Sequence, residues 1–314
     1  MPWKDRYTIS DERSLADADI KWPDGAQLAV HVTLNLSPAC DGGGIEPADL
    51  RAPDAQYGLH GALDTLLPVL DRHNIHLTVA VPAVIAAIHA DRMRALAAAG
   101  HEIVPNGWRN EDPALLDRAQ EAERIGRATE VLAKISGSRP RGWYSLPRPS
   151  DKFATGSVSS HTMDLLLDAG YEWFGNGLAD DAPHWWVTDF ASRRALLCLP
   201  YYYHFDDQFF LMFPAMGTGL EHADSLFRNW RSEFQAQYLR GRCFHMVLHP
   251  HAIAFAHRLR MLDHFLTDLR SHPGLWNPTG SALAEPTRPT TPGFMLSTMV
   301  VGIRIVAPRS LVVS

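Results

Sequence analysis

Short apolar segments alternate with longer amphipathic segments along most of this chain, and few folds accommodate that order. The short segments predict strands at 27–36, 76–81, 102–104, 141–144, 172–174, 195–199 and 243–248. Apolar side chains at helical spacing predict helices at 60–73, 83–88, 92–99, 114–135, 161–169, 223–239 and 258–271. Repeated strand–helix units form a parallel sheet with right-handed crossovers. Since the repeating part spans about 250 residues, we favour an α/β fold closed into a barrel over an open sheet.

The two ends of the chain do not follow this alternation. Residues 1–25 predict an irregular lead-in, and residues 285–314 combine a Pro/Thr-rich linker with an apolar tail. We therefore predict a single domain over residues 1–284. Two interpretations of the tail stay open, an extra strand that docks on the body or on a neighbour, and a non-native extension.

Charge and cysteine usage exclude several classes of partner. The net charge is −6 and no run of Lys or Arg stands out, which disfavours nucleic acid and anionic membranes as partners. The N-terminal residues are polar, and no apolar run reaches the roughly 18 residues of a membrane span, so we expect a cytoplasmic protein. Cys40, Cys198 and Cys243 are few, odd in number and far apart, which favours a reducing compartment over a disulfide framework.

Polar and aromatic residues follow most of the predicted strands. They occupy residues 35–37, 105–112, 144–148, 200–208 and 249–251. Because ligands of parallel barrels bind at the carboxyl ends of the strands, we expect these residues to surround a pocket for a small-molecule substrate. No G-x-S-x-G elbow, P-loop or G-x-G-x-x-G motif occurs, which disfavours serine hydrolases, nucleotide hydrolases and Rossmann enzymes.

Five stretches, in this order along residues 20–284, resemble the polysaccharide-deacetylase superfamily, in the branch close to allantoinase and cyclic-imide hydrolases. They are Tyr57-Gly58, His101-Glu102-Ile103 with Gly107-Trp108-Arg109, the run Arg139-Pro140-Arg141-Gly142-Trp143, Pro200-Tyr201 with Asp207, and Leu248-His249-Pro250 with Arg258. The resemblance implies a distorted, seven-stranded NodB-like (β/α) barrel. It also implies hydrolysis of a carbon–nitrogen bond and, by analogy, a homo-oligomer.

The resemblance also locates a metal site whose ligands have changed. Metal-binding relatives supply an Asp after the first strand and two His in an H-x-x-x-H spacing after the third. The matching positions here are Asn35, followed by Ser37, and the pair Asn106 and Asn110. Neutral amides are poor zinc ligands, so we expect no metal cofactor at these positions. The alternative is a divalent metal such as zinc at a non-standard site, for example His249 with His204 or His31.

The same resemblance gives His249 the role of proton donor or stabiliser. From the residue types we expect Glu111 or Asp207 to orient it or to act as the base on water. Side chains predicted to bind substrate are Asn35, Asn106, Trp108, Arg109, Asn110, Tyr144, Arg148 and Tyr201. The two arginines and the tryptophan suit a planar polar ring, and the amides suit a developing oxyanion. The alternatives are loop or cap roles for the asparagines, packing for the tyrosines and a surface charge for Arg148.

Three functions follow from these residues. The leading hypothesis is a metal-independent hydrolase of a small cyclic amide, imide or ureide. The second is an amino-sugar or polysaccharide deacetylase with a non-standard metal site. The third is a catalytically silent relative that binds a ligand or scaffolds an assembly.

Overall fold

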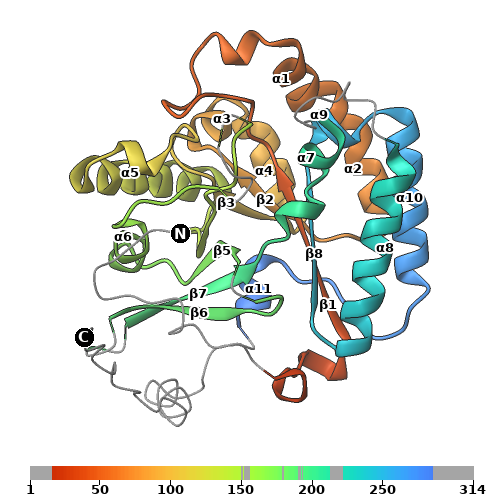
Figure 1. The fold of residues 1–314 in the computed structure, drawn as a ribbon. Helices are drawn as coiled ribbons and strands as arrows, with labels where there is room; N and C mark the ends of the chain where they lie inside the picture. The colour runs from red at the N-terminus through yellow and green to blue at the C-terminus, as the bar shows by residue number, and fades with distance from the viewer. Residues whose placement is uncertain are drawn as a thin grey trace, which may run out of the picture.

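The computed structural model describes residues 16–149, 151, 156–178, 180–189, 192, 194–212 and 222–285. One sheet has the order β3-β2-β1-β8 and is parallel, with strands Glu102–Pro105, Thr78–Val81, Leu28–Asn35 and Cys243–Leu248 (Figure 1). The short β9 (Leu275–Trp276) also pairs with β1. The second sheet has the order β4-β5-β7-β6, with strands Gly142–Trp143, Trp173–Gly177, Arg194–Pro200 and His184–Asp189. Only β6 is antiparallel to its neighbour in this sheet.

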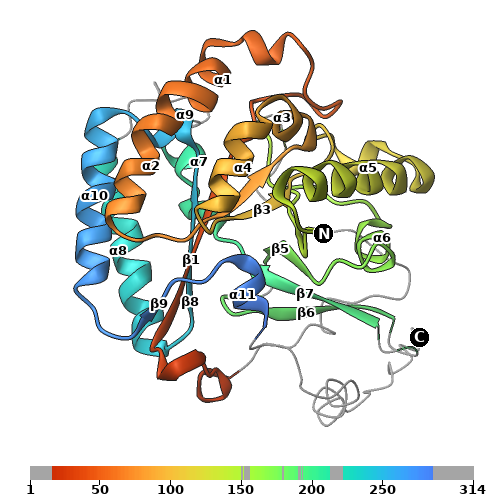
Figure 2. The same cartoon turned by 180° about the vertical axis from the view of Figure 1, so that it is seen from behind.

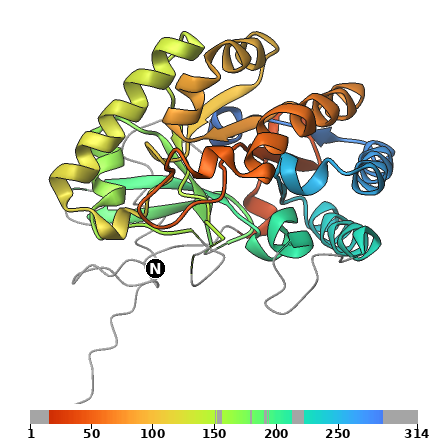
Figure 3. The same cartoon turned by 90° about the horizontal axis from the view of Figure 1, so that it is seen from above.

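Helices lie along the outer side of the strands (Figures 2 and 3). In chain order they are α1 Pro53–Tyr57, α2 Leu63–Arg72, α3 Ala83–Ile88, α4 Ala90–Ala98, α5 Arg118–Ser136, α6 Thr162–Asp168, α7 Asp207–Met212, α8 Ala223–Arg240, α9 Pro250–Ile253, α10 Ala256–Arg270 and α11 Gly280–Ala284. The long helices α8 and α10 pack against each other beside β8. Within the described residues, no helix is long and apolar enough to cross a lipid bilayer.

Two hydrophobic cores lie on opposite faces of the strands. On β1, the alternate residues Leu28, Val30, Val32 and Leu34 join the core between strands and helices. The intervening Ala29 joins a second core, together with Val104, Tyr144, Trp173, Leu199 and Val247 from the other strands. All eight residues of β1 are therefore buried, as expected for a strand covered on both faces.

This second core, which we term the inner core, fills the space that the strands surround. A parallel bridge between Asn106 and Tyr144 connects the two sheets, so the parallel strands run in the order β8-β1-β2-β3-β4-β5-β7. Within the described residues no ladder joins β7 to β8. The arrangement is the predicted α/β fold and agrees with a distorted barrel of seven parallel strands.

Helix α11 closes one end of the inner core. Leu283 and Ala284 are part of that core, and the Trp173 indole donates a hydrogen bond to the Ser281 hydroxyl at 3.1 Å. The Ser281 backbone amide donates to Glu102 at 2.9 Å. Of the predicted tail, Glu285 forms an ion pair with Arg141, and residues 286–314 lie outside the described residues.

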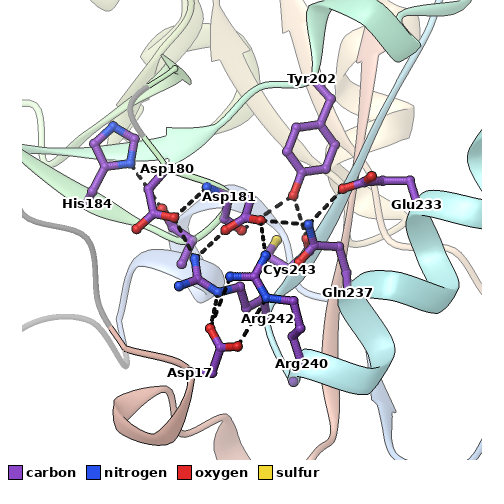
Figure 4. Close-up of polar contacts among 12 residues, drawn as sticks. Asp17, Asp180, Asp181, His184, Tyr202, Glu233, Gln237, Arg240, Arg242 and Cys243 are labelled. Atoms are coloured by element: carbon purple, nitrogen blue, oxygen red, sulfur yellow. Dashed lines mark hydrogen bonds and ion pairs between the residues drawn. The ribbon is translucent and has the colours of Figure 1, made fainter.

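A charged cluster ties the lead-in to the body of the protein. The buried Arg242, which directly precedes β8, contacts Asp17 of the lead-in and both Asp180 and Asp181 of the β5–β6 connection (Figure 4). Arg240 pairs with Asp17 at 3.1 Å and with Asp181 at 2.7 Å. These contacts join three segments that are distant in the sequence.

All seven predicted strands and all seven predicted helical segments are confirmed, with some changes in their bounds. The helix predicted at 114–135 begins later, at Arg118, and a short 3-10 turn covers Pro113–Leu115. Asp117 is the N-cap at which α5 begins, because its carboxylate accepts the Gln120 amide N–H at 2.9 Å, while the Gln120 side chain accepts the Asp117 N–H. This reciprocal capping box fixes the first turn of α5.

Candidate active site

The carboxyl ends of β1 and β8 bring Asn35 and His249 together beside the start of α7. The His249 ring nitrogen Nδ1 lies 2.7 Å from Oδ1 of Asp207, the first residue of α7. The His249 backbone N–H donates to the same carboxylate at 2.9 Å. His249 is only 1% exposed and Asp207 is fully buried, so the carboxylate fixes both the position and the orientation of the ring.

The second ring nitrogen of His249 faces an amide. Nδ2 of Asn35 lies 2.9 Å from His249 Nε2, and the Ser37 backbone N–H donates to Asn35 Oδ1 at 3.0 Å. Because the Asn35 oxygen is an acceptor for Ser37, its NH₂ group must donate to Nε2. The partners therefore assign a neutral His249 with its proton on Nδ1, where it donates to Asp207.

The charged groups around His249 raise the pKa of its ring above the ordinary value. Burial acts to lower the pKa of His249, but the carboxylates of Asp206 and Asp207 outweigh it and raise the pKa. Burial raises the pKa of Asp207, against the hydrogen bonds that it accepts from His249. A histidine whose Nδ1–H is held by a carboxylate can accept a proton at Nε2 and return it, which is general acid–base chemistry.

Asp206 adds a second carboxylate beside the pair. Its Oδ1 lies 3.5 Å from His249 Nδ1, and its Oδ2 accepts the hydroxyl of Tyr201 at 3.0 Å. Tyr201 is buried, and its hydroxyl points to Asp206. The structure therefore places this predicted substrate-binding residue behind the acid–base pair, as a support for Asp206.

The three positions matched to metal ligands form one hydrogen-bonded group with Ser37, which we term the amide cluster (Asn35, Ser37, Asn106 and Asn110). Asn106 Nδ2 donates to the Ser37 hydroxyl at 2.8 Å and to Asn110 Oδ1 at 3.3 Å. The Leu146 backbone N–H donates to Asn106 Oδ1 at 2.8 Å. Sequence reasoning placed these side chains together, and the structure brings them together.

The amide cluster does not fit a divalent metal ion. All three amide oxygens already accept a hydrogen bond, from Ser37, Leu146 and Asn106, and none carries a charge. Within the described residues, the one group of three ionisable ligands dense enough for an ion is Asp206, Asp207 and His249, with ligand atoms within 4.8 Å of one another. Those atoms already bond to each other and to Tyr201.

Three predicted substrate-binding residues make their contacts away from His249. Arg148 is buried, which excludes the surface-charge alternative, and its guanidinium bonds to Asp151, Ser157 and the Asn110 carbonyl. Arg109 reaches outward to Glu46 at 2.7 Å. The Trp108 ring lies under the Arg127 guanidinium, 4.2 Å from its centroid. None of these contacts involves His249.

Among the described residues, neither Glu111 nor Tyr144 forms a hydrogen bond or ion pair with His249. Glu111 accepts the Arg109 backbone N–H and lies 3.9 Å from the Arg124 guanidinium. The Tyr144 hydroxyl lies in the inner core, 2.8 Å from Thr33 Oγ1. The structure thus joins Asp207, and not Glu111, to His249.

A polar layer beneath the site was missed at the sequence level. Thr33 Oγ1 lies 2.9 Å from His245 Nε2 and 3.2 Å from His31 Nε2, all inside the barrel. Burial lowers the pKa of His31 to about 3 and that of His245 well below its ordinary value. The signal that could have found this layer is the polar residue at every second position of β1, at 31, 33 and 35.

Known proteins resemble this chain in sequence and in fold. Residues 54–173 match the family described as polysaccharide deacetylase. A peptidoglycan deacetylase from Helicobacter pylori is 20% identical over 246 residues, which cover 70% of this chain and 81% of the relative.

Solved structures are similar over most of the chain. A putative polysaccharide deacetylase from Mycobacterium smegmatis has a TM-score of 0.73 at 26% identity, covering 85% of this chain and 92% of that one. A probable polysaccharide deacetylase from Pseudomonas aeruginosa has a TM-score of 0.70 at 25% identity, covering 84% and 92%. The structure of Puue allantoinase has a TM-score of 0.73 at 24% identity, covering 89% and 96%, and shares the fold.

Proposed function

From the polysaccharide-deacetylase domain that this chain carries, we infer a hydrolase acting on carbon–nitrogen bonds other than peptide bonds. We propose that it opens a small cyclic amide, imide or ureide without the metal site of its relatives. The observation that supports this most directly is His249, held by Asp207 at 2.7 Å with its Nε2 directed at the amide cluster.

The residues supply the parts of an acid–base mechanism. His249 Nε2 takes a proton from water as the water oxygen attacks the ring carbonyl carbon, and Asp207 stabilises the imidazolium that forms. The NH₂ group of Asn35, once it has turned from His249 Nε2, donates to the carbonyl oxygen as its negative charge develops. The ring carbon–nitrogen bond then breaks, and the leaving nitrogen takes the proton from His249. Water reaches Nε2 when the Asn35 amide turns away from it.

A second candidate is deacetylation of an amino sugar. The peptidoglycan deacetylase relative favours it, and the group of Asp206, Asp207 and His249 is where a non-standard metal site would have to form. This candidate requires those side chains to exchange their mutual hydrogen bonds for an ion.

The test uses purified, metal-stripped protein, assayed on cyclic imides and ureides and on N-acetylated amino-sugar oligomers, with and without added zinc. We expect turnover of a ring substrate without metal, and a loss of about a hundredfold or more in kcat for His249→Ala. The control is His257→Ala, at an exposed position of α10. Zinc-dependent turnover of only the acetylated oligomers would support the second candidate. Absence of turnover with ligand binding intact would indicate a silent, ligand-binding relative.

A further inference from the structure

A narrow pocket lies beside the amide cluster, between the loop after β3 and the first turns of α5. Asn106 and Asn110 of the cluster form part of its lining. The charged and aromatic residues that line it are Trp108, Glu111, Glu121, Arg124, Trp143 and Arg148. The pocket is therefore contiguous with the amide cluster, and through Ser37 and Asn35 with His249.

Glu111 presents an unsatisfied acceptor in this pocket. Its side chain is only 8% exposed, and its Oε2 accepts the backbone N–H of Arg109. Its Oε1 has no hydrogen-bond donor among the described residues. A buried carboxylate oxygen without a donor costs free energy, and a ligand that brings one recovers it.

The position of Glu111 is fixed by the backbone around it. Gly107 has φ of 75° and Asn110 has φ of 57°, so the chain turns sharply on both sides of Arg109. A Cβ atom at Gly107 would lie 3.2 Å from the Asn110 nitrogen. Because the Arg109 N–H holds Oε2 within this turn, Oε1 is the oxygen left for a ligand.

The charges near Glu111 select the kind of donor. The Arg124 guanidinium is 3.9 Å from Oε1, and the buried Arg148 also lines the pocket. Glu121 adds a second carboxylate to the lining, so two arginines face two carboxylates, and a neutral N–H group suits the pocket better than an ammonium group. Trp108 and Trp143 add apolar surface that suits a planar group.

We propose that this pocket is a substrate subsite in which Glu111 Oε1 accepts a hydrogen bond from an N–H group of a neutral amide or ureide. The inference rests on the proposed function for the link to catalysis, since the amide cluster separates the subsite from His249. Glu111 is then a substrate-binding residue, and His249 with Asp207 carries the proton transfers.

The experiment measures binding of hydantoin and its N-methylated derivatives to the full chain by calorimetry, with the indole signal of Trp143 followed by NMR. We expect methylation of the bound nitrogen to weaken binding at least tenfold, since it removes the donor. In Glu111→Gln, the Arg109 N–H retains the amide oxygen, so the NH₂ group faces the pocket. That variant should bind hydantoin at least tenfold more weakly and lose its preference for the unmethylated ring.

The control is Glu46→Gln, at an exposed position that bonds to the Arg109 side chain and lies outside the pocket. It should bind hydantoin like the parent protein. Thermal unfolding of each variant checks that the fold is retained. The subsite is refuted by hydantoin affinity that is unchanged in Glu111→Gln, or by no binding to the parent protein. Binding that depends on Glu111 without turnover would refute the proposed function alone, and turnover without that dependence would refute the subsite alone.

Discussion

At the scale of single residues, two neighbours of His249 favour opposite protonation states of its ring. Asp207 favours the charged imidazolium, whereas the NH₂ group of Asn35 can donate only to a neutral Nε2. Protonation at Nε2 therefore requires the Asn35 side chain to move or rotate. Proton uptake by His249 and displacement of Asn35 are thus linked events, and a substrate that binds the Asn35 amide promotes both.

Asp207→Asn tests the carboxylate that holds this ring. Loss of the negative charge at 2.7 Å should lower the pKa of His249 and reduce kcat by about a hundredfold or more. An NMR titration of the His249 ring and the rate on the ring substrate measure the two effects. The matched variant is Asp206→Asn, whose carboxylate lies farther away, at 3.5 Å. An equal or larger effect of Asp206→Asn would show that the direct bond is not what matters.

The motif residues of the site could be predicted from the sequence, but their side-chain directions could not. His249 and Asp207 come from short stretches with a family resemblance, and strand ends bring them together. Arg109 belongs to a similar stretch, yet it points to Glu46, because that loop turns sharply at Asn110. Such a turn depends on φ values that the residue order does not specify. The catalytic role predicted for Glu111 and the substrate-binding role predicted for Arg148 likewise depended on side-chain directions that the sequence does not specify.

At the scale of elements, alternation predicts the parallel strands well because both of their faces are buried. The additional β6 was missed since it belongs to an antiparallel hairpin with β7 inside an otherwise parallel order. The two-residue β9 is too short to carry a pattern. The sequence also did not indicate which large side chain packs against which glycine. Gly142 lies opposite Trp173 across β4 and β5, and the Tyr144 ring packs where a side chain at Gly175 would be.

The space around each glycine predicts opposite effects on stability when Gly142 or Gly126 is changed to alanine. In Gly142→Ala the new Cβ would lie 1.9 Å from the Trp173 ring, so the free energy of unfolding should fall by about 1–3 kcal/mol. Gly126 lies within α5 with no atom within 4 Å of an added Cβ. Gly126→Ala should therefore raise the free energy of unfolding by about 0.5–1 kcal/mol. Urea unfolding measures both, and a neutral Gly142→Ala would contradict the close packing of β4 on β5.

At the scale of the whole molecule, several buried histidines are stable only when neutral. Burial lowers the pKa of His31 to about 3, and the pKa of His251 to about 3 with a further contribution from His249. The pKa of His245 is lowered well below its ordinary value, first by burial and then by His31. Their contribution to stability is complete above the unfolded pKa of about 6.5 and is lost as the pH falls toward 3. His249 acts in the opposite sense, because its raised pKa contributes stability below about 6.5 that is lost as the pH rises.

The contribution of the described histidines to stability should therefore fall between neutral pH and pH 5, since five lowered histidines, which include His89 and His101, outnumber one raised histidine. The raised pKa values of Glu102, Glu121 and Asp207 act in the opposite sense. A histidine with a folded pKa of about 3 and an unfolded pKa of about 6.5 costs about 2 kcal/mol at pH 5. His31→Gln removes one such group while a side chain that can hydrogen-bond remains beside Thr33 and Tyr144. Its free energy of unfolding in urea should fall by about 2 kcal/mol less than that of the parent protein between pH 7 and 5. The exposed His257→Gln should follow the parent curve. A His31→Gln curve parallel to the parent curve would mean that His31 has the same pKa in the folded protein as in the unfolded chain, which its burial opposes.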